Sequence, residues 1–467
     1  MIVMKFGGTS VQDGSAMKRV LEIVGREKDR SPVVVLSAIA GATNALLKLG
    51  DVAVTGSTRA AQEILSELVT RHRWILFDLG LPKDKEREVA TAIARHAEEL
   101  ENFVRGIVLL KELSARTQDT LVSYGERLST LLFEAAAAAR GLPVVNVDAR
   151  NLIVTDQRFG KARPQRELLA GRVREILGPL LAEGRLPVTE GFIGATKDGV
   201  TTTLGRGGSD YTAALLGEAL GAEEIQIWTD VDGMLTADHR VVPEGMKIRE
   251  LSFAEAAELA TFGAKVLHPS TIEPAVARDI PVRILNSLRP DSRGTTITAR
   301  SRRTGVAVKS IAAKKGATMV HVHSLGMLMA HGFLKSMFEV FDRHQVSVDL
   351  VATSEVSVSL TVDQTAGLDE IVSELSRFSE VKVEGGCAIV SLVGEEIRST
   401  PGIAARAFSA VKSVNVRMIS QGASEINLSF VVAEEEADEA VRCLHREFFS
   451  GGVESDVFEP VAAELSG

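Results

Sequence analysis

Cysteine is almost absent from this 467-residue chain, and long apolar runs are missing. Cys387 and Cys443 have no CxxC or Cys/His spacing around them, which excludes a disulfide scaffold and a structural zinc site. No uncharged apolar stretch approaches the ~18 residues of a membrane span, and the apolar run at residues 1–6 is too short for a signal peptide. The sequence therefore predicts a cytoplasmic protein of a reducing compartment, with no membrane partner.

Basic charge is also in short supply. The 53 Lys and Arg residues are outnumbered by 62 Asp and Glu residues, which gives a net charge of -9. A nucleic-acid binder usually presents a basic face, so we expect no nucleic-acid partner. The composition, 45% hydrophobic and 25% charged, is otherwise that of a soluble globular protein. The length allows about two to four domains.

Glycines concentrate in one stretch, 201–212, with the sequence TTTLGRGGSDYT. Three threonines favour a strand, and the apolar run that follows favours a helix capped by Ser209 or Asp210. A strand, a glycine-rich turn and a helix N-terminus can bind an anion, because free N–H groups and the helix dipole point at the ligand. The alternative is a plain sharp turn before a capped helix. Arg206 within the turn favours the anion site.

Other strands are predicted to alternate with helices as far as residue ~290. The apolar runs 2–6, 32–37 and 224–230 each lead into a small-residue loop or a further polar segment. This alternation predicts an α/β sandwich with a mostly parallel sheet, in which ligands bind at the carboxyl ends of the strands. The charged region 58–114 is predicted to form a helical flap with solvated faces.

Glu126 stands at the edge of the apolar face of a helix predicted over 121–140. An acid in such a place is most often solvated, so a surface side chain is the commoner interpretation. The alternative is a carboxylate aimed into a pocket for a cationic group. The helical pattern leaves both interpretations open.

The last third of the chain contains an internal repeat, which is found by comparing the chain with itself. One constant shift places Gly332 on Gly402, Phe338 on Phe408, Val346 on Val416, Ser354-Glu355 on Ser424-Glu425, Ser359 on Ser429 and Phe378 on Phe448. Each copy is predicted to be a βαββα unit of the ferredoxin-like kind. Two such small units are typical of a regulatory or dimerising module.

Four motifs, in this order, closely resemble those of aspartate kinases. They are KFGGTS from Lys5, VSYGE ending at Glu126, TTLGRGGSD ending at Asp210, and FGAKVLHP from Phe262. The resemblance covers essentially the whole chain, and the internal repeat matches the tandem ACT domains of that family. Because the chain ends soon after the repeat, it looks like the monofunctional form.

The resemblance also implies the domain organisation. It predicts an amino-acid kinase sandwich over residues 1–295. A first ferredoxin-like ACT domain would cover 316–388, and a second would be built from 305–315 and 389–467.

The reaction implied by the resemblance transfers the γ-phosphoryl group of MgATP to the β-carboxylate of L-aspartate. The product would be 4-phospho-L-aspartate, in the first step of lysine, threonine and methionine biosynthesis. A carboxylate nucleophile is already ionised at neutral pH and needs no general base. The site must instead hold two anions together and neutralise charge on the phosphoryl group. In the family pattern Lys5 and Lys265 face the phosphates, and Asp210 orients Lys5 through a short ion pair.

The remaining site residues are also taken from the resemblance. Arg206 matches the partner of the substrate's α-carboxylate, and Glu126 matches the partner of its α-ammonium group. The other matching substrate positions are Ser37, Thr43, Gly207, Gly208 and Ser209. The matching nucleotide positions, besides the two lysines, are Phe6, Gly7, Gly8, Thr229, Asp230, Leu235, Arg240 and Val266. The amides of Gly7, Gly8 and 207–209 would serve as backbone donors, and the ligands of Mg²⁺ are not assigned. Leu235 departs from the pattern, because close relatives often carry Tyr beside the adenine.

The first repeat resembles that of lysine-sensitive aspartate kinases, in which the inhibitor lies between two first ACT domains. L-Lysine is therefore the expected effector, acting on a homodimer formed through the ACT domains, with a tetramer as the alternative. Burying the lysine ammonium requires an acid, and Asp349 and Glu355 are the carboxylates at matching positions. The other matching positions are Met327, Phe333, Leu334, Ser347, Val348, Thr353 and Ser354. Ala330 replaces the Ser of the pattern, so weaker inhibition is expected. Asp349 and Glu355 as ordinary turn acids are the alternative.

Two other functions compete with this interpretation. One is another amino-acid kinase, such as an acetylglutamate, glutamate 5- or uridylate kinase, and the pairing of Arg206 with Glu126 and the ACT tandem count against it. The other is a catalytically inactive amino-acid sensor. Such a sensor is expected to have lost Lys5, Lys265 or Arg206, and all three are present.

Overall fold

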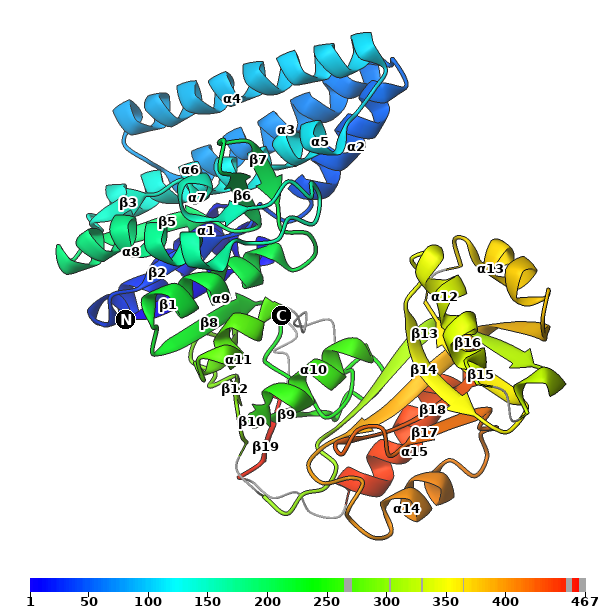
Figure 1. The fold of residues 1–467 in the computed structure, drawn as a ribbon. Coiled ribbons are helices and arrows are strands. Elements are labelled where there is room, and N and C mark those ends of the chain that lie inside the picture. Colours follow the sequence, from blue (N-terminus) through cyan, green and yellow to red (C-terminus); the bar gives the residue numbers. More distant parts are fainter. Residues whose placement is uncertain (264–270, 302–303, 329–330, 364, 451–455, 462–467) are drawn as a thin grey trace. The chain divides into compact units, whose positions relative to one another are not determined.

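The computed structural model describes residues 1–263, 271–301, 304–328, 331–363, 365–450 and 456–461 (Figure 1). The chain forms two compact units, which are described separately. The first contains Met1–Met234, Glu250–Phe253 and residues 271–301. The second contains Leu235–Arg249, residues 254–263 and the described residues from 304 onward.

An eight-stranded sheet forms the centre of the first unit, in the order β10-β12-β11-β8-β1-β2-β5-β3. Every neighbouring pair is parallel except β11 with β12, so the predicted mostly parallel sheet is confirmed. The central strand is buried along its whole length, which explains its continuous apolar run. The strands are β1 Ile2–Phe6, β2 Val33–Leu36, β3 Val144–Asn146, β5 Leu186–Glu190, β8 Glu224–Thr229, β10 Glu250–Ser252, β11 Val282–Asn286 and β12 Thr295–Thr298.

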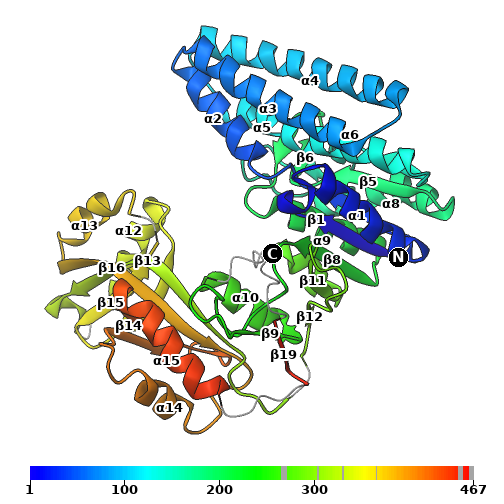
Figure 2. The same ribbon diagram turned by 180° about the vertical axis from the view of Figure 1, so that it is seen from behind.

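Helices pack around this sheet, and some extend beyond it as a separate layer. They are α1 Gly14–Arg26, α2 Ala42–Val54, α3 Thr58–Leu79, α4 Lys83–Leu110, α5 Ala115–Val122, α6 Tyr124–Ala139, α7 Ala149–Leu152, α8 Arg166–Ala182, α9 Gly208–Leu220 and α11 Glu273–Ala277. The predicted helical flap is the pair α3 and α4, which lie side by side in both views (Figures 1 and 2). Its buried positions recur every three to four residues and face the neighbouring helices, as in an amphipathic helix.

A small three-stranded sheet, β4-β6-β7, carries the glycine-rich stretch. Its strands are β4 Val154–Thr155, β6 Ile193–Thr196 and β7 Thr201–Thr203. The strands β6 and β7 form an antiparallel hairpin, and Gly199 in its turn has φ +77°. Gly205 and Gly207 also have positive φ, a conformation that favours glycine, so the chain turns sharply from β7 into α9.

The second unit contains the repeat as one six-stranded sheet, in the order β14-β15-β13-β16-β18-β17. The strands are β13 Ser310–His323, β14 Val348–Thr353, β15 Ser357–Val362, β16 Glu380–Val393, β17 Met418–Gln421 and β18 Asn427–Ala433, and the helices are α12 Phe333–Arg343, α13 Leu368–Leu375, α14 Ile403–Ala410 and α15 Ala437–Phe449. Each copy has the order βαββα, and the shift that places Gly332 on Gly402 also places β13 on β16 at both ends. The predicted repeat is confirmed.

The two repeats share their central strands. The first half of β13, Ser310–Lys315, pairs with Ala388–Val393 of the second repeat. Its second half, Thr318–His323, pairs with β15 of its own repeat. The register shifts between Lys315 and Ala317, where Gly316 has φ +81°. One strand therefore serves both copies, and the repeats form a single sheet.

Segments from the middle of the chain complete the second unit. They are α10 Phe253–Thr261 and the strand β9 Met246–Ile248, which pairs with β19 Phe458–Pro460. Ile311 N donates to Thr236 O at 2.8 Å, and Thr236 Oγ1 lies 3.0 Å from His445 Nε2. Within α10, Glu255 forms a buried ion pair with Lys309, 3.0 Å between Oε1 and Nζ. Residues 235–249 and α10 therefore pack with the repeats.

Candidate active site

A pocket of about 650 Å³ lies at the carboxyl ends of the parallel strands of the first unit. It is built by the end of β1, the loop between β2 and α2, the start of α6, the bend after β5 and the turn before α9. Its lining is Lys5, Gly8, Ser37, Ala38, Ile39, Ala40, Gly41, Thr43, Asn44, Leu47, Glu126, Phe192, Gly205, Arg206, Gly207, Gly208, Ser209 and Asp210. All the predicted substrate positions, and Lys5 and Asp210, are therefore brought together.

Lys5 and Asp210 form the predicted ion pair, with 2.6 Å between Nζ and Oδ1. Lys5 is the second-last residue of β1 and is only 8% exposed, and Asp210 lies in the first turn of α9. A carboxylate near a helix N-terminus is stabilised by the helix dipole. The pair therefore fixes a buried ammonium group at one end of the pocket.

Two of the five predicted backbone donors are already engaged. Gly7 N donates to Trp228 O at 2.9 Å, because it continues the ladder between β1 and β8. Gly208 N donates to Gly205 O at 3.0 Å and closes the turn before α9. The expectation of free amides is therefore wrong for these two glycines.

Arg206 lies in the turn between β7 and α9 and is exposed at the pocket. No ion-pair partner for its guanidinium group is present among the described residues. Gly208 follows in the first turn of the helix, where an added Cβ would lie 2.7 Å from Phe192 Cδ2. The glycines therefore allow the turn to pack closely while Arg206 stays available to an anion.

Glu126 is buried, with 3% of its surface exposed, so the commoner expectation of a solvated side chain is wrong. Gly125 explains this, because its Cα packs so closely that an added Cβ would lie 2.9 Å from Ala38 Cβ. Ala38 N donates to Glu126 Oε1 at 3.3 Å, whereas Oε2 has no hydrogen-bond partner in the described part of the chain. Burial raises the pKa of Glu126 to about 8, although the hydrogen bond from Ala38 N lowers it, and the nearby charge of Glu190 adds a smaller rise. A buried carboxylate oxygen without a partner is suited to a cationic ligand group.

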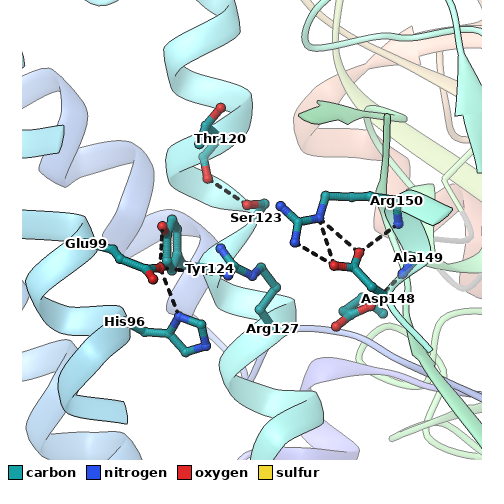
Figure 3. A network of polar contacts seen from close by, with 10 residues as sticks. His96, Glu99, Thr120, Ser123, Tyr124, Arg127, Asp148, Ala149 and Arg150 are labelled. Carbon is teal, nitrogen blue, oxygen red and sulfur yellow. Dashed lines mark hydrogen bonds and ion pairs between the residues drawn. The ribbon is translucent and has the colours of Figure 1, made fainter. Parts of the chain in front are cut away.

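Figure 3 shows a polar network that includes Tyr124 and Arg127, which lie on α6, the helix that carries Glu126. Tyr124 donates its hydroxyl to Glu99 Oε2 at 2.9 Å, and the guanidinium carbon of Arg127 lies 4.3 Å from the Tyr124 ring centroid. Glu190 is buried and accepts a hydrogen bond from Ala149 N at 2.9 Å. Burial, and then the charge of Asp148, raise the pKa of Glu190 to about 7. The substrate pocket therefore adjoins an acid-rich interior.

Sequence reasoning missed several of these residues. Asn44 lies in the first turn of α2, directly after the small-residue loop at the end of β2, and its place beside a strand end could have identified it. Phe192 lines the pocket from the bend after β5, and the charge of the buried Glu190 adds to the raised pKa of Glu126. No motif pointed to these two residues, because their role depends on packing between distant segments.

Comparisons with known proteins agree with this geometry. Residues 1–286 match the Amino acid kinase family, and residues 390–448 match an ACT domain. Aspartokinase 1, chloroplastic, of Arabidopsis thaliana is 41% identical over 464 residues, which cover 96% of this chain and 80% of that protein. The chain belongs to the aspartokinase family. It is accordingly a kinase, an enzyme that transfers a phosphoryl group.

Two solved structures of one aspartokinase are also similar to this chain. The crystal structure of E. coli aspartokinase III in complex with aspartate and ADP, its R-state, matches with a TM-score of 0.84 and 41% identity, covering 96% of this chain and 100% of that one. The T-state structure of the same relative, in complex with lysine and aspartate, matches with a TM-score of 0.80 and 42% identity, covering 96% and 99%.

The predicted nucleotide positions of this aspartokinase are divided between the two units. Thr229 and Asp230 lie at the carboxyl end of β8, next to β1, with Thr229 Oγ1 3.1 Å from Asp230 Oδ1. Leu235 and Arg240 belong to the second unit, and the guanidinium group of Arg240 binds Asp238. Lys265 and Val266, like Ala330 of the first repeat, lie outside the described residues.

The predicted effector positions lie on the first repeat. Asp349 on β14 is already paired, because Lys314 Nζ lies 3.0 Å from its Oδ1 and 2.6 Å from Asp363 Oδ2. Oδ2 of Asp349 has no hydrogen-bond partner within the described ranges, and burial raises the pKa of Asp349. Glu355 is exposed. The remaining positions lie at the 3₁₀ turn before α12 (Met327), at the start of α12 (Phe333 and Leu334), on β14 (Val348 and Thr353) and directly before and after β14 (Ser347 and Ser354).

The described helices include none that is long and apolar enough to cross a membrane. The same residues contain no group of three or more His, Cys, Asp and Glu side chains arranged to hold a metal ion. A metal that arrives with nucleotide phosphates needs only one or two carboxylates from the protein, so Mg²⁺ stays a prediction.

Proposed function

We propose that this aspartokinase transfers the γ-phosphoryl group of MgATP to the β-carboxylate of L-aspartate, yielding 4-phospho-L-aspartate for lysine, threonine and methionine biosynthesis. One observation carries the proposal. A single pocket presents the buried ammonium group of Lys5, together with a carboxylate oxygen of Glu126 and a guanidinium group of Arg206 that have no partner among the described residues. Those three charges complement an ammonium group, a carboxylate and a phosphoryl acceptor on one small molecule.

Each charged side chain of the pocket is assigned to a different group of the substrate. Glu126 binds the α-ammonium group of aspartate, and Arg206 binds its α-carboxylate with two parallel hydrogen bonds. Ser37 and Thr43 complete the wall on the side of α2. The β-carboxylate is then directed to Lys5, whose charge offsets the charge on the transferred group. Asp210 holds Lys5 in place.

The nucleotide would lie along the carboxyl ends of β1 and β8, close to Phe6, Gly7, Gly8, Thr229 and Asp230. Lys265 and Val266 would complete this side, with Lys265 as a second phosphate-facing cation. Leu235 and Arg240, which belong to the second unit, stay predicted nucleotide positions. Mg²⁺ bound with the nucleotide would reduce the charge of the phosphates, and its protein ligands are not assigned.

A substrate panel tests the reaction. ADP release would be followed with L-aspartate, L-glutamate, N-acetyl-L-glutamate and UMP as acceptors, with the Arg206→Ala and Lys265→Ala proteins as matched controls. We expect turnover with L-aspartate alone, and a turnover loss of ~10²-fold or more for Lys265→Ala. Preference for any other acceptor would contradict the proposal.

L-Lysine is the proposed feedback inhibitor. Two observations support it: the T-state structure of the relative contains lysine, and Asp349 offers a largely buried acid on β14. Four residues of strand, about 13 Å, separate Asp349 from Thr353, and Glu355 lies two residues beyond. A lysine ligand would have to lie almost fully extended along β14 to contact both ends of this set in one copy. We therefore propose a homodimer through the first repeat, in which two copies complete each lysine site.

The effector is tested by measuring turnover at rising L-lysine and, separately, at rising L-threonine. Inhibition by lysine at millimolar or lower concentration is expected, with little response to threonine. The reverse response would remove lysine as the effector and leave the kinase reaction untouched. Sedimentation with and without lysine tests the dimer, and a tetramer is the other assembly to distinguish.

The domain limits remain a proposal: a kinase domain over 1–295, a first ACT domain over 316–388, and a second from 305–315 and 389–467. The pairing of Ser310–Lys315 with Ala388–Val393 supports the split of the second ACT domain.

A further inference from the structure

Asp119, on α5, is a buried carboxylate outside the pocket lining, 2% exposed. Gly160 N lies 3.0 Å from its Oδ1 and 2.9 Å from its Oδ2. Thr203 donates twice, its backbone N to Oδ2 at 2.9 Å and its Oγ1 to Oδ1 at 2.7 Å. Asp119 has no ion-pair partner in the described part of the chain. The carboxylate is therefore held by three donors from two distant segments.

Thr203 is the last residue of β7 and stands three positions before Arg206. On the side that faces away from β6, this strand has no neighbouring strand among the described residues. Asp119 accepts the Thr203 N–H there, and Ala162 N donates to Thr203 O at 2.9 Å. Asp119 and the turn around Gly160 therefore take the place of a neighbouring strand and fix where β7 ends.

The turn around Gly160 also contacts the arginine turn directly. Gly205 has φ +78°, and a Cβ added to it would lie 3.2 Å from Gly160 O and 3.5 Å from Lys161 Cγ. Asp119 binds Gly160 and Thr203 at once, so it holds both surfaces of this contact. Movement of either surface would shift the residue that follows Gly205, which is Arg206.

The helix that carries Asp119 is itself fixed to the opposite wall of the pocket. Helix α5 packs against α2, whose first turn carries Thr43. The contact is close, because a Cβ added to Gly50 of α2 would lie 3.2 Å from Leu121 Cδ2. Asp119 therefore connects the wall that contains Thr43 to the turn that contains Arg206.

We propose that Asp119 is a positioning residue that sets the place of Arg206, and through it the enzyme's selectivity for substrates with an α-carboxylate. This rests on the proposed role of Arg206 in binding that carboxylate. Three donors around the carboxylate favour its ionised form, although burial raises the pKa of Asp119. Asparagine in its place keeps the size, but in either orientation its NH₂ group lies against Gly160 N–H, which is within 3.0 Å of both carboxylate oxygens, and pushes that turn away.

The test compares L-aspartate with L-aspartate 1-amide, which replaces the α-carboxylate by a neutral amide and keeps the reacting group. Wild type should prefer L-aspartate in kcat/KM, and Arg206→Ala should remove that preference. If wild type shows no preference, the proposed role of Arg206 fails, whatever Asp119 does.

With the preference established, Asp119→Asn should lower kcat/KM for L-aspartate by ~10–100-fold while changing that of the 1-amide by less than about twofold. The KM of ATP should not change. An equal loss with both substrates, or an unchanged preference, would overturn the inference.

Two substitutions at adjacent positions of β7 test the proposed role of Asp119 if Asp119→Asn does not fold. Thr203→Val removes only the hydroxyl donor to Asp119. Thr202→Val removes a hydroxyl one position earlier, which lies 2.7 Å from Thr155 Oγ1 in the same small sheet. Both lose one buried hydroxyl from β7, so their thermal stabilities should fall alike. Only Thr203→Val should reduce the preference for L-aspartate, and equal preferences in the two variants would contradict the proposal.

Discussion

Two acids of this enzyme, one in each unit, are proposed to bind an ammonium group of an amino acid, and they differ in whether a cation of the protein already pairs with them. Glu126 in the substrate pocket has one carboxylate oxygen without a partner among the described residues. Asp349 on the first repeat already holds a cation, the side chain of Lys314. A ligand ammonium therefore adds a missing partner to Glu126, whereas at Asp349 it must compete with one. The difference indicates a large binding gain in the pocket and a small one at the regulatory site.

The second repeat shows that the fold alone does not create the regulatory acid. The shift that relates the two copies places Lys314 on Glu384 and Asp349 on Ile419. Glu384 pairs with Arg417, 2.7 Å between Oε1 and the guanidinium nitrogen, so the strand that carries Lys in one copy carries Glu in the other. At the position of Asp349, the same backbone therefore offers an acid to a ligand in one copy only.

The largest effect is expected from Glu126→Gln. Gln cannot neutralise the substrate ammonium, so kcat/KM for L-aspartate should fall by ~10²-fold or more, about 3–5 kcal/mol. Steady-state kinetics with varied aspartate would measure this, and the KM of ATP should stay within about twofold. Glu190→Gln is the matched control, a buried acid that does not line the pocket, and it should lose far less. Equal losses in the two variants would show that the loss does not come from a specific contact between Glu126 and the substrate.

Asp349→Ala should abolish lysine inhibition while turnover persists. Lys314 keeps its contact with Asp363 in this variant, so no buried charge is left alone. The half-inhibitory lysine concentration should rise by ~20-fold or more, within the usual range of allosteric coupling. Ile419→Ala, at the equivalent position of the second repeat, should remain as sensitive to lysine as wild type. Persistent inhibition of Asp349→Ala would remove this acid from the effector site.

A pH series should distinguish the two acids. Glu126, with a pKa of about 8, is mostly protonated at pH 6 and must ionise to bind the substrate ammonium. The affinity for L-aspartate should therefore increase about fivefold from pH 7 to pH 8.

The pKa of Glu126 in the folded protein lies above its value in the unfolded chain. The folded state therefore binds more protons between pH ~4.5 and ~8, and the contribution of Glu126 to the free energy of unfolding falls as pH rises through this range. Isothermal titration and thermal melts would measure both trends. Glu126→Gln should flatten them, and an unchanged slope would contradict the assignment.

Lys314→Met should have the smallest effect. Removing the internal cation leaves Asp349 and Asp363 to the ligand, so the half-inhibitory lysine concentration should fall by up to about fivefold, the usual worth of a partly exposed ion pair. Lys315→Met is the control, since Lys315 pairs with Asp438 of the second repeat. Weaker inhibition in Lys314→Met would mean that Lys314 supports the lysine site instead of competing for it.

The parts of the pocket that follow from local sequence were predictable. Gly205 and Gly207 are required by a turn of positive φ, and Lys5 and Arg206 occupy fixed places beside strand and helix ends. The burial of Glu126 was not, because its position at the edge of a helix face suits either environment. That choice is made by Ala38, which belongs to a loop far earlier in the chain. Helical periodicity contains no information about such a loop.

Long-range pairing also limits what can be predicted from the sequence of the regulatory region. The internal repeat predicted both copies, since finding it only requires comparing the chain with itself. It did not predict the contact of Lys314 with Asp349, which depends on the register between β13 and its neighbours. Nor did it place residues 235–249 with the repeats. Their hydrogen bonds run to Ile311 and His445, which no local pattern connects to Thr236.

The shared strand β13 has a consequence for how the protein is made. Ser310–Lys315 leaves the ribosome before Ala388–Val393, the partner strand, by roughly 75 residues, which takes about 4–15 s at usual elongation rates. During that interval the first repeat can close over Thr318–His323, but the first half of β13 lacks its partner strand, and of its residues Ile311 can bond only to Thr236. An open apolar edge pairs readily with the same segment of another chain. Nascent chains translated from one message would therefore be able to exchange this half-strand and emerge as intertwined pairs.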